Sequence, residues 1–212
     1  MVRLCLCLFI SLSAASYTLA NDTINQGKTL STTCVACHGE DGNSKISLFP
    51  KLAGQQQDYL LKQLLDIQSG KRNVPQMTGL LTTYSPQNLS AIVAYFSTQK
   101  TTLGKASANK VEQGETLFRF GNPDSGVPAC ASCHGPAGKG LNSATFPALA
   151  GQFEQYTKSQ LIQFKTGGRH NDPSEMMQTI TKKMTDNEMD AVANYIQGLH
   201  ESSQDHDKTH KK

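Results

Sequence analysis

The chain has 212 residues, which is enough for one medium domain or for two small domains of roughly 90 residues, each with only a modest core. Its formal charge of +3 is too close to neutral to indicate a nucleic-acid partner, and no long run of Lys or Arg occurs. Composition and charge therefore do not identify a binding partner. The cysteines are the most informative residues.

Residues 1–20 are predicted to be a cleaved secretory signal, so that the mature protein is exported. Arg3 supplies a short positive start, residues 4–15 are nearly all apolar or small, and small residues precede the expected cut. A membrane anchor is the alternative, but the apolar stretch is shorter than the roughly 20 residues that a span requires. Removing the segment lowers the formal charge to +2 and takes away two of the six cysteines, Cys5 and Cys7.

The four remaining cysteines lie in an internal repeat, in which residues 26–98 align with residues 113–198. Both copies contain Cys-x-x-Cys-His-Gly and then Phe-Pro-x-Leu-Ala-Gly-Gln. The second copy has nine extra residues before its first cysteine, and the turn-forming residues 121–126 are expected to hold them as a loop. The predicted organisation is a domain over 21–98, a linker over 99–110, a domain over 111–200 and a polar tail over 201–212.

Helix signals dominate both copies. The first copy predicts one helix over 59–69 and a last helix whose apolar residues recur at helical spacing from Leu89 to Phe96. The second copy repeats this pattern over 156–166 and from Met189 to Ile196. The two last helices have residues suited to cap them, Ser85 and Thr185. No alternating pattern favours a strand, so the predicted fold class is all-α.

Cys-x-x-Cys-His is the attachment signal for c-type haem. On a helix, Cys37 and His38 lie on the same face as Cys34, so two thiols can bond to one porphyrin while the imidazole coordinates its iron. The alternatives are a disulfide, a zinc site and a thioredoxin-like pair, but none explains a histidine after both second cysteines. The chain is therefore predicted to bind two covalent haem c groups. The second motif consists of Cys130, Cys133 and His134.

An iron that passes electrons needs a sixth ligand, and a thioether is a usual one where the reduction potential is high. In the first copy this is predicted to be Met77, which lies in a loop before the last helix and has no rival nearby. The second copy offers four methionines, of which Met184 and Met189 are expected to be core residues. Met177 is favoured over Met176 because Met177 and Met77 each lie eight residues before the cap of the last helix.

Pro50 and Pro147 follow the two haem motifs in the repeated Phe-Pro-x-Leu-Ala-Gly-Gln segment. An imidazole ligand needs a hydrogen-bond acceptor on its other nitrogen, which holds its tautomer and orientation. A proline carbonyl can serve as this acceptor, and a plain turn after the haem loop is the alternative.

Together these residues resemble the dihaem cytochrome c4 family, in which two class I cytochrome c domains stand in tandem. The resemblance runs from about residue 26 to residue 200. It implies His/Met ligation of both irons, a proline carbonyl bonded to each ligating histidine, and haems that face one another across a pseudo-twofold interface. It also implies a periplasmic location. Besides the haem motifs and the Phe-Pro segments, it covers Met77-Thr78-Gly79, Asn171-Asp172, Met177 and the closing residues 195–200.

The expected function is electron transfer, not catalysis. The chain would shuttle single electrons between membrane respiratory complexes, with a donor such as a quinol-oxidising complex. The resemblance implies delivery of these electrons to a terminal oxidase, commonly of the cbb type. The alternative is a dihaem subunit of a larger dehydrogenase. A dihaem peroxidase would need an open iron position, which a methionine in both copies argues against. We expect no nucleic-acid partner, unequal reduction potentials, and no transmembrane helix even if the protein associates with membranes. His206 and His210 lie in the polar tail, which is expected to be disordered.

Overall fold

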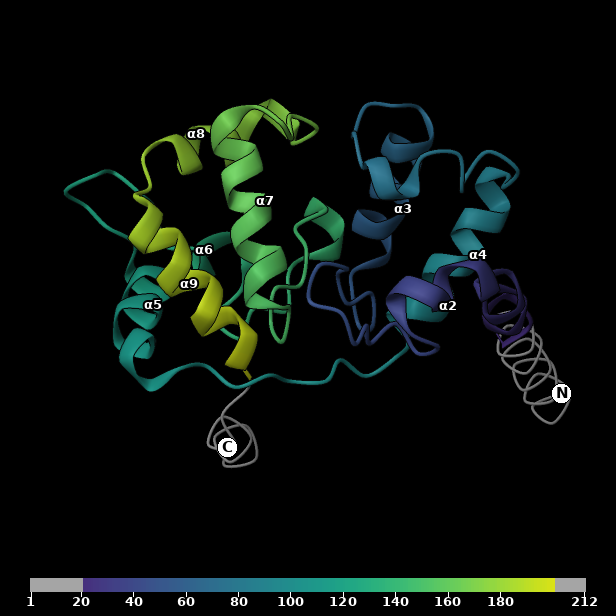
Figure 1. The fold of residues 1–212 in the computed structure, drawn as a ribbon, viewed down its shortest axis with the longest axis horizontal. Helices are drawn as coiled ribbons and strands as arrows, with labels where there is room; N and C mark the ends of the chain where they lie inside the picture. Colours follow the sequence, from purple (N-terminus) through teal and green to yellow (C-terminus); the bar gives the residue numbers. More distant parts are fainter. Residues whose placement is uncertain (1–20, 201–212) are drawn as a thin grey trace, which may run out of the picture.

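The structure is a computed structural model that describes residues 21–200, so the predicted signal segment and the polar tail lie outside the described residues. Two helical halves stand beside one another, and one extended segment connects them (Figure 1). The described residues form helices and loops, with isolated β-bridges at Asn122–Val127 and Leu141–Phe146 in place of any strand. The all-α prediction is confirmed.

The two halves share an order of elements. In the first half, residues 21–30 are helical, and they are followed by α2 Thr32–His38, α3 Gln57–Gln68, the 3₁₀ helix η1 Pro75–Met77 and α4 Pro86–Ser97. The second half consists of α5 Ala108–Phe120, α6 Ala131–His134, η2 Asn142–Ala144, α7 Glu154–Thr166, η3 Pro173–Glu175, α8 Met176–Lys182 and α9 Asp186–Gly198. The first cysteine motif lies in α2, and the second lies in α6 and its N-cap residue Cys130. The candidate methionines lie in η1 and at the start of α8.

The last helix of each half begins as the sequence predicts. The Ser85 hydroxyl accepts a hydrogen bond from the Asn88 backbone N–H, and Thr185 accepts one from Glu188, in each case within a capping box. The predicted apolar stripes are buried: Leu89, Ile92, Val93, Phe96, Met189, Val192, Ala193 and Ile196 are each at most 2% exposed. These stripes form the centres of two separate hydrophobic cores.

A glycine lets two helices cross closely in each half. A Cβ atom added at Gly114 on α5 would lie 2.3 Å from the carbonyl oxygen of Ala191 on α9, and one at Gly27 would lie 1.9 Å from that of Ala91 on α4. Both glycines belong to the repeated Gln-Gly segment. The absence of a side chain therefore sets the spacing between the first and last helices of each half.

The predicted linker, residues 99–110, is tied to both halves. The Thr102 backbone N–H donates to the side-chain oxygen of Asn43 in the first half at 2.8 Å. The Gly104 N–H donates to the carbonyl of Gln197 in the second half at 2.9 Å. The last three residues of the predicted segment already belong to α5. The linker is thus an ordered connection that is hydrogen-bonded to both halves.

The helix crossing gives a stability prediction. Gly114→Ala should destabilise the protein by about 1–3 kcal/mol, because the new methyl group must displace the backbone of α9, and this outweighs the better helix propensity of alanine. Denaturant unfolding measures the difference. Gly168→Ala is the matched control, since its Cβ would meet only contacts of 3.8 Å, and it should leave stability nearly unchanged. Equal stability of the two variants would contradict the close crossing.

Candidate haem sites

A continuous cavity of about 1000 Å³ runs between the two halves. Its wall is mainly apolar, and it contains every residue that the sequence predicts as a site residue: Cys34, Cys37, His38, Pro50, Met77, Cys130, Cys133, His134, Pro147 and Met177. Residues that lie up to 143 positions apart in the sequence are thus brought to one space. Within residues 21–200, no group of three or more His, Cys, Asp and Glu side chains could hold a metal ion directly, so a four-cysteine zinc site is not formed.

The two motif histidines have the same surroundings. Nδ1 of His38 lies 2.9 Å from the carbonyl oxygen of Pro50, and Nδ1 of His134 lies 3.0 Å from that of Pro147. A carbonyl can only accept, so each Nδ1 carries the proton and Nε2 keeps its lone pair. Burial lowers the pKa of both histidines, although the bond to the carbonyl opposes this shift. Each imidazole is therefore neutral and suited to bind iron through Nε2.

The motif cysteines form no disulfide and are partly buried in the cavity wall. Burial, with a smaller contribution from Cys37, raises the pKa of Cys34 to about 11, and burial likewise raises that of Cys130 to about 11. Thioredoxin-like cysteines have the opposite property, a lowered pKa. The electrostatics therefore argue against a redox-active thiol pair.

The backbone conformation at the candidate methionines differs between the two halves. Met77 ends the 3₁₀ helix η1 and packs against the first core. Met177 lies in the first turn of α8, where the Asp172 carboxylate accepts from its backbone N–H at 2.8 Å and from that of Gln178 at 3.1 Å. Met176 also lines the cavity but is 38% exposed.

The structure thus provides what two haems require: in each half two thiols, a neutral imidazole, a nearby thioether, and an apolar space that all of them line. Met184 and Met189 are buried at 4% and 0% exposure in the second core, as predicted. Both pack in this core, and Met184 also borders the cavity. Met176 and Met177, outside the core, remain the candidates of the second half.

A glutamine pair joins the halves beside the haem cavity. The Gln55 side chain accepts from the Ala148 N–H at 2.6 Å and donates to its carbonyl at 2.8 Å. In the reverse direction, the Gln152 side chain makes the same two bonds, both 3.0 Å, with the backbone of Lys51. These glutamines end the repeated Phe-Pro-x-Leu-Ala-Gly-Gln segments, and each binds residue x of the other copy. The repeat therefore encodes a reciprocal contact between the halves.

One position of this contact differs between the copies. The Lys51 amine donates to the carbonyls of Thr102 and Gly151 and lies 4.7 Å from the ring centre of Phe153, whereas the second copy has Ala148 at the corresponding place. Burial lowers the pKa of Lys51. A buried amine thus stands next to Pro50 in the first half, without a counterpart in the second.

Sequence reasoning missed two arginines in the cavity wall, Arg72 and Arg169. They are separated by 97 residues, the same spacing that relates Tyr59 to Tyr156 and the repeated Phe-Pro segments. Each donates hydrogen bonds to side chains of the opposite half. The common spacing was the signal that could have identified them.

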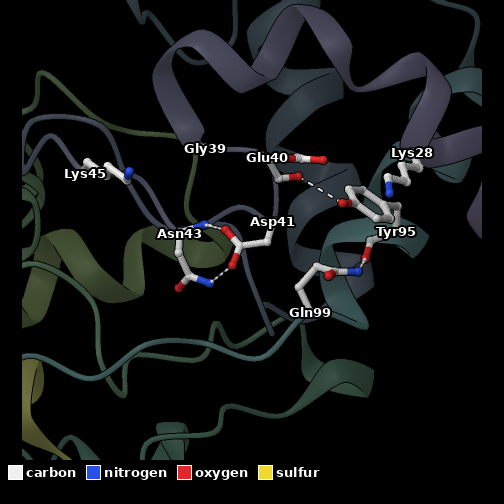
Figure 2. A pocket seen from close by; sticks show the side chains of 8 residues that line it. All are labelled: Lys28, Gly39, Glu40, Asp41, Asn43, Lys45, Tyr95 and Gln99. Carbon is white, nitrogen blue, oxygen red and sulfur yellow. Dashed lines mark hydrogen bonds between the residues drawn. The ribbon is translucent and has the colours of Figure 1, made fainter.

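A second pocket, of about 500 Å³, lies on the outside of the first half and contains none of the predicted site residues (Figure 2). In it, the Asp41 carboxylate accepts two hydrogen bonds from Asn43, which lower its pKa, and the Tyr95 hydroxyl donates to the carbonyl of Glu40 at 2.9 Å. Asn43 also donates to the carbonyl of Lys100. The pocket is the outer side of the turn that fastens the first haem motif to α4 and the linker.

Comparison with known proteins agrees with this geometry. The model of the Cytochrome c family matches residues 24–100 and 111–200. Cytochrome c4 of Pseudomonas aeruginosa is 46% identical over 201 residues, which are 94% of this chain and 100% of that protein. The crystal structure of reduced recombinant cytochrome c4 from Pseudomonas stutzeri superposes with a TM-score of 0.80 at 46% identity and covers 82% of this chain and 97% of that one. A thiosulfate dehydrogenase electron acceptor of Thiomonas intermedia is 36% identical over 171 residues, 77% of this chain and 76% of that protein.

Two matched regions in one chain define a tandem c-type cytochrome, with one covalent haem c for each Cys-x-x-Cys-His motif. The family can be stated more narrowly, because the similarity extends over nearly the whole length of several relatives. The chain belongs to the dihaem cytochrome c4 family, whose members transfer electrons and are not enzymes.

The reciprocal glutamine contact gives a second stability prediction. Gln152→Ala should cost about 1–3 kcal/mol, because it leaves the buried N–H and carbonyl of Lys51 without their partner. The free energy of unfolding of the haem-loaded protein measures this loss. Gln113→Ala on the exposed side of α5 is the control and should be neutral. A neutral Gln152→Ala would show that the contact does not hold the halves together.

Proposed function

We propose that the chain carries single electrons in the periplasm, with His38 and Met77 as the axial ligands of the first haem iron and His134 and Met177 as those of the second. The observation that carries this proposal is that each half contributes a neutral, proline-bonded imidazole and a thioether to the wall of the shared cavity. An iron held on both sides has no open position for a substrate and is suited to electron transfer alone.

When bound, each haem supplies an iron that gains or loses one electron. The chain's own part is to fix the porphyrin through two thiols, to keep the proton on histidine Nδ1, and to surround the group with apolar side chains. Pro50 and Pro147 hold the two imidazoles in one tautomer and one orientation. Such fixed surroundings keep the change of geometry on electron transfer small.

The proposed partners are membrane respiratory complexes, with a quinol-oxidising complex as donor and a cbb-type oxidase as acceptor. Within residues 21–200, the helices are too short or too polar to cross a bilayer.

A second candidate function is electron acceptance from a dehydrogenase, which the similarity to the thiosulfate dehydrogenase electron acceptor of Thiomonas intermedia supports. Unequal potentials of the two haems are expected as well, since Lys51 and the unlike methionine loops make the two environments different.

The assignment of Met177 is tested by removing one sulfur at a time. Met177→Leu should abolish the sulfur-to-iron absorption band of one of the two oxidised haems, and Met77→Leu should abolish that of the other. Leucine preserves the size and apolar character of the side chain, so the haems should stay in place. Met176→Leu is the matched control and should retain both bands. Loss of a band in Met176→Leu alone would transfer the assignment to Met176.

The electron-carrier function is tested with the purified, haem-loaded protein. Reduced protein added to membranes that contain a cbb-type oxidase should be reoxidised and support oxygen uptake. One O2 should be consumed for every two protein molecules, because each molecule supplies two electrons and the reduction of O2 to water takes four. Reduction by thiosulfate dehydrogenase together with failure to feed the oxidase would favour the second candidate. Rapid binding of carbon monoxide by the reduced protein at neutral pH would reveal an open iron and contradict both. A mass measurement of the exported protein tests the predicted cut after Ala20 and the presence of two haems.

A further inference from the structure

A cluster of polar side chains lies at the centre of the contact between the halves, on the wall of the haem cavity. It contains three residues from each copy, and the members of each pair are 97 residues apart. We call it the arginine cluster, and its members are Tyr59, Gln63, Arg72, Tyr156, Gln160 and Arg169.

The guanidinium of Arg72 bonds both halves. Its Nη1 donates to the side-chain oxygen of Gln63 in its own half at 2.9 Å. Its Nη2 donates across the interface to the hydroxyl of Tyr156 at 3.1 Å and to the side-chain oxygen of Gln160 at 2.9 Å.

Arg169 repeats the arrangement in the opposite direction. Its Nη1 donates to Gln160 in its own half at 2.9 Å, and its Nη2 donates across the interface to Tyr59 at 3.0 Å and to Gln63 at 3.1 Å. The same guanidinium stacks on Phe164, with its carbon 4.4 Å from the ring centre. Both arginines are therefore fixed in position by neutral groups.

The positive charges of this cluster have no direct counter-charge. Neither arginine forms an ion pair with a carboxylate within residues 21–200, and Arg169 is only 7% exposed. The neighbouring carboxylate, Asp66, already forms an ion pair with Lys62 and accepts a hydrogen bond from Asn171. Buried charges are normally paired, so two guanidinium groups that lack an ion-pair partner beside a cavity indicate an anion in that cavity.

Both arginines have unused donors. A guanidinium has five N–H groups, of which the hydrogen bonds of Arg72 use three. Arg169 also donates from Nε to the side-chain oxygen of Asn171 at 3.1 Å, so its bonds use four. Each haem brings two propionate carboxylates into the cavity, and the planar guanidinium is well matched to a carboxylate. The negative charge of the propionates would thus supply the counter-charge that the two guanidinium groups lack.

We propose that Arg72 and Arg169 bind haem propionates on the wall that the two sites share, and that they couple the two haems electrostatically. Each guanidinium is held by residues of both halves, so its charge acts on both irons. A fixed positive charge favours the reduced state, in which the iron centre carries one positive charge less. The inference rests on the two haems of the proposed function, but it depends neither on the redox partners nor on the choice of methionine ligand.

The test is a redox titration of haem-loaded variants. Arg72→Gln and Arg169→Gln should each lower the midpoint potentials of both haems, and Arg72→Lys, which keeps the charge, should lie closer to wild type. Arg119→Gln is the matched control, because Arg119 pairs with Glu115 on the outer surface of α5 and should leave both potentials unchanged. Redox-difference infrared spectra should show shifted propionate carboxylate bands in the two cluster variants and not in the control.

If the cluster had a purely structural role, its glutamine variants would lose thermal stability while their propionate carboxylate bands stayed in place. Unchanged potentials and bands in both glutamine variants, at full haem content, would overturn the inference. If these variants do not fold, a crystal structure of the haem-loaded wild type decides. It should show a propionate oxygen within hydrogen-bond distance of Arg72 or Arg169, and a cluster without such a contact would overturn the inference. Failure of the electron-transfer assays would leave these readouts unaffected, so the two proposals fail separately.

Discussion

Each motif histidine is buried and hydrogen-bonded through Nδ1 to a proline carbonyl, and this bond orients the imidazole that would bind the haem iron. It keeps the proton on Nδ1 of His38 and His134, so that Nε2 faces the cavity with a free lone pair. The segment that provides the carbonyl also provides the residue whose backbone binds the glutamine of the other half. One repeated stretch of seven residues therefore orients the ligand and joins the two halves.

This double role explains why neither half is independent of the other. Each half has its own core, built around its last helix, but the cavity wall is completed by side chains from both. The ordered linker and the arginine cluster act across the same boundary. An electron carrier with two haems benefits from this construction, because a fixed interface keeps the distance between the two irons constant.

Much of the fold could be predicted from the sequence, because local rules determine it. The apolar spacing of Leu89 to Phe96 and the capping residues Ser85 and Thr185 identify the last helices, and the structure agrees. The cysteine motifs identify the cofactor without any tertiary information. The helices predicted from residues 59 and 156 begin two residues earlier in the structure, at Gln57 and Glu154.

Other features depend on tertiary contacts and leave little trace in the sequence. The roles of Gln55 and Gln152 appear only when the opposite backbone is in view, and the same holds for Arg72 and Arg169, whose partners lie 84 to 110 positions away. Equal distance from a helix cap favours Met177, but it does not reveal that α8 begins at Met176 and that Asp172 fixes its first turn. The domain limits, the axial ligands and the signal segment stay predictions.

The proposed electron carrier holds each of its two irons between a histidine and a methionine. Proton NMR of the reduced, haem-loaded wild-type protein can detect this ligation, because the methyl group of a methionine bound to low-spin haem iron is shifted far upfield by the porphyrin ring current. We expect two such methyl signals of three protons each. A single signal, or none, would contradict this ligation.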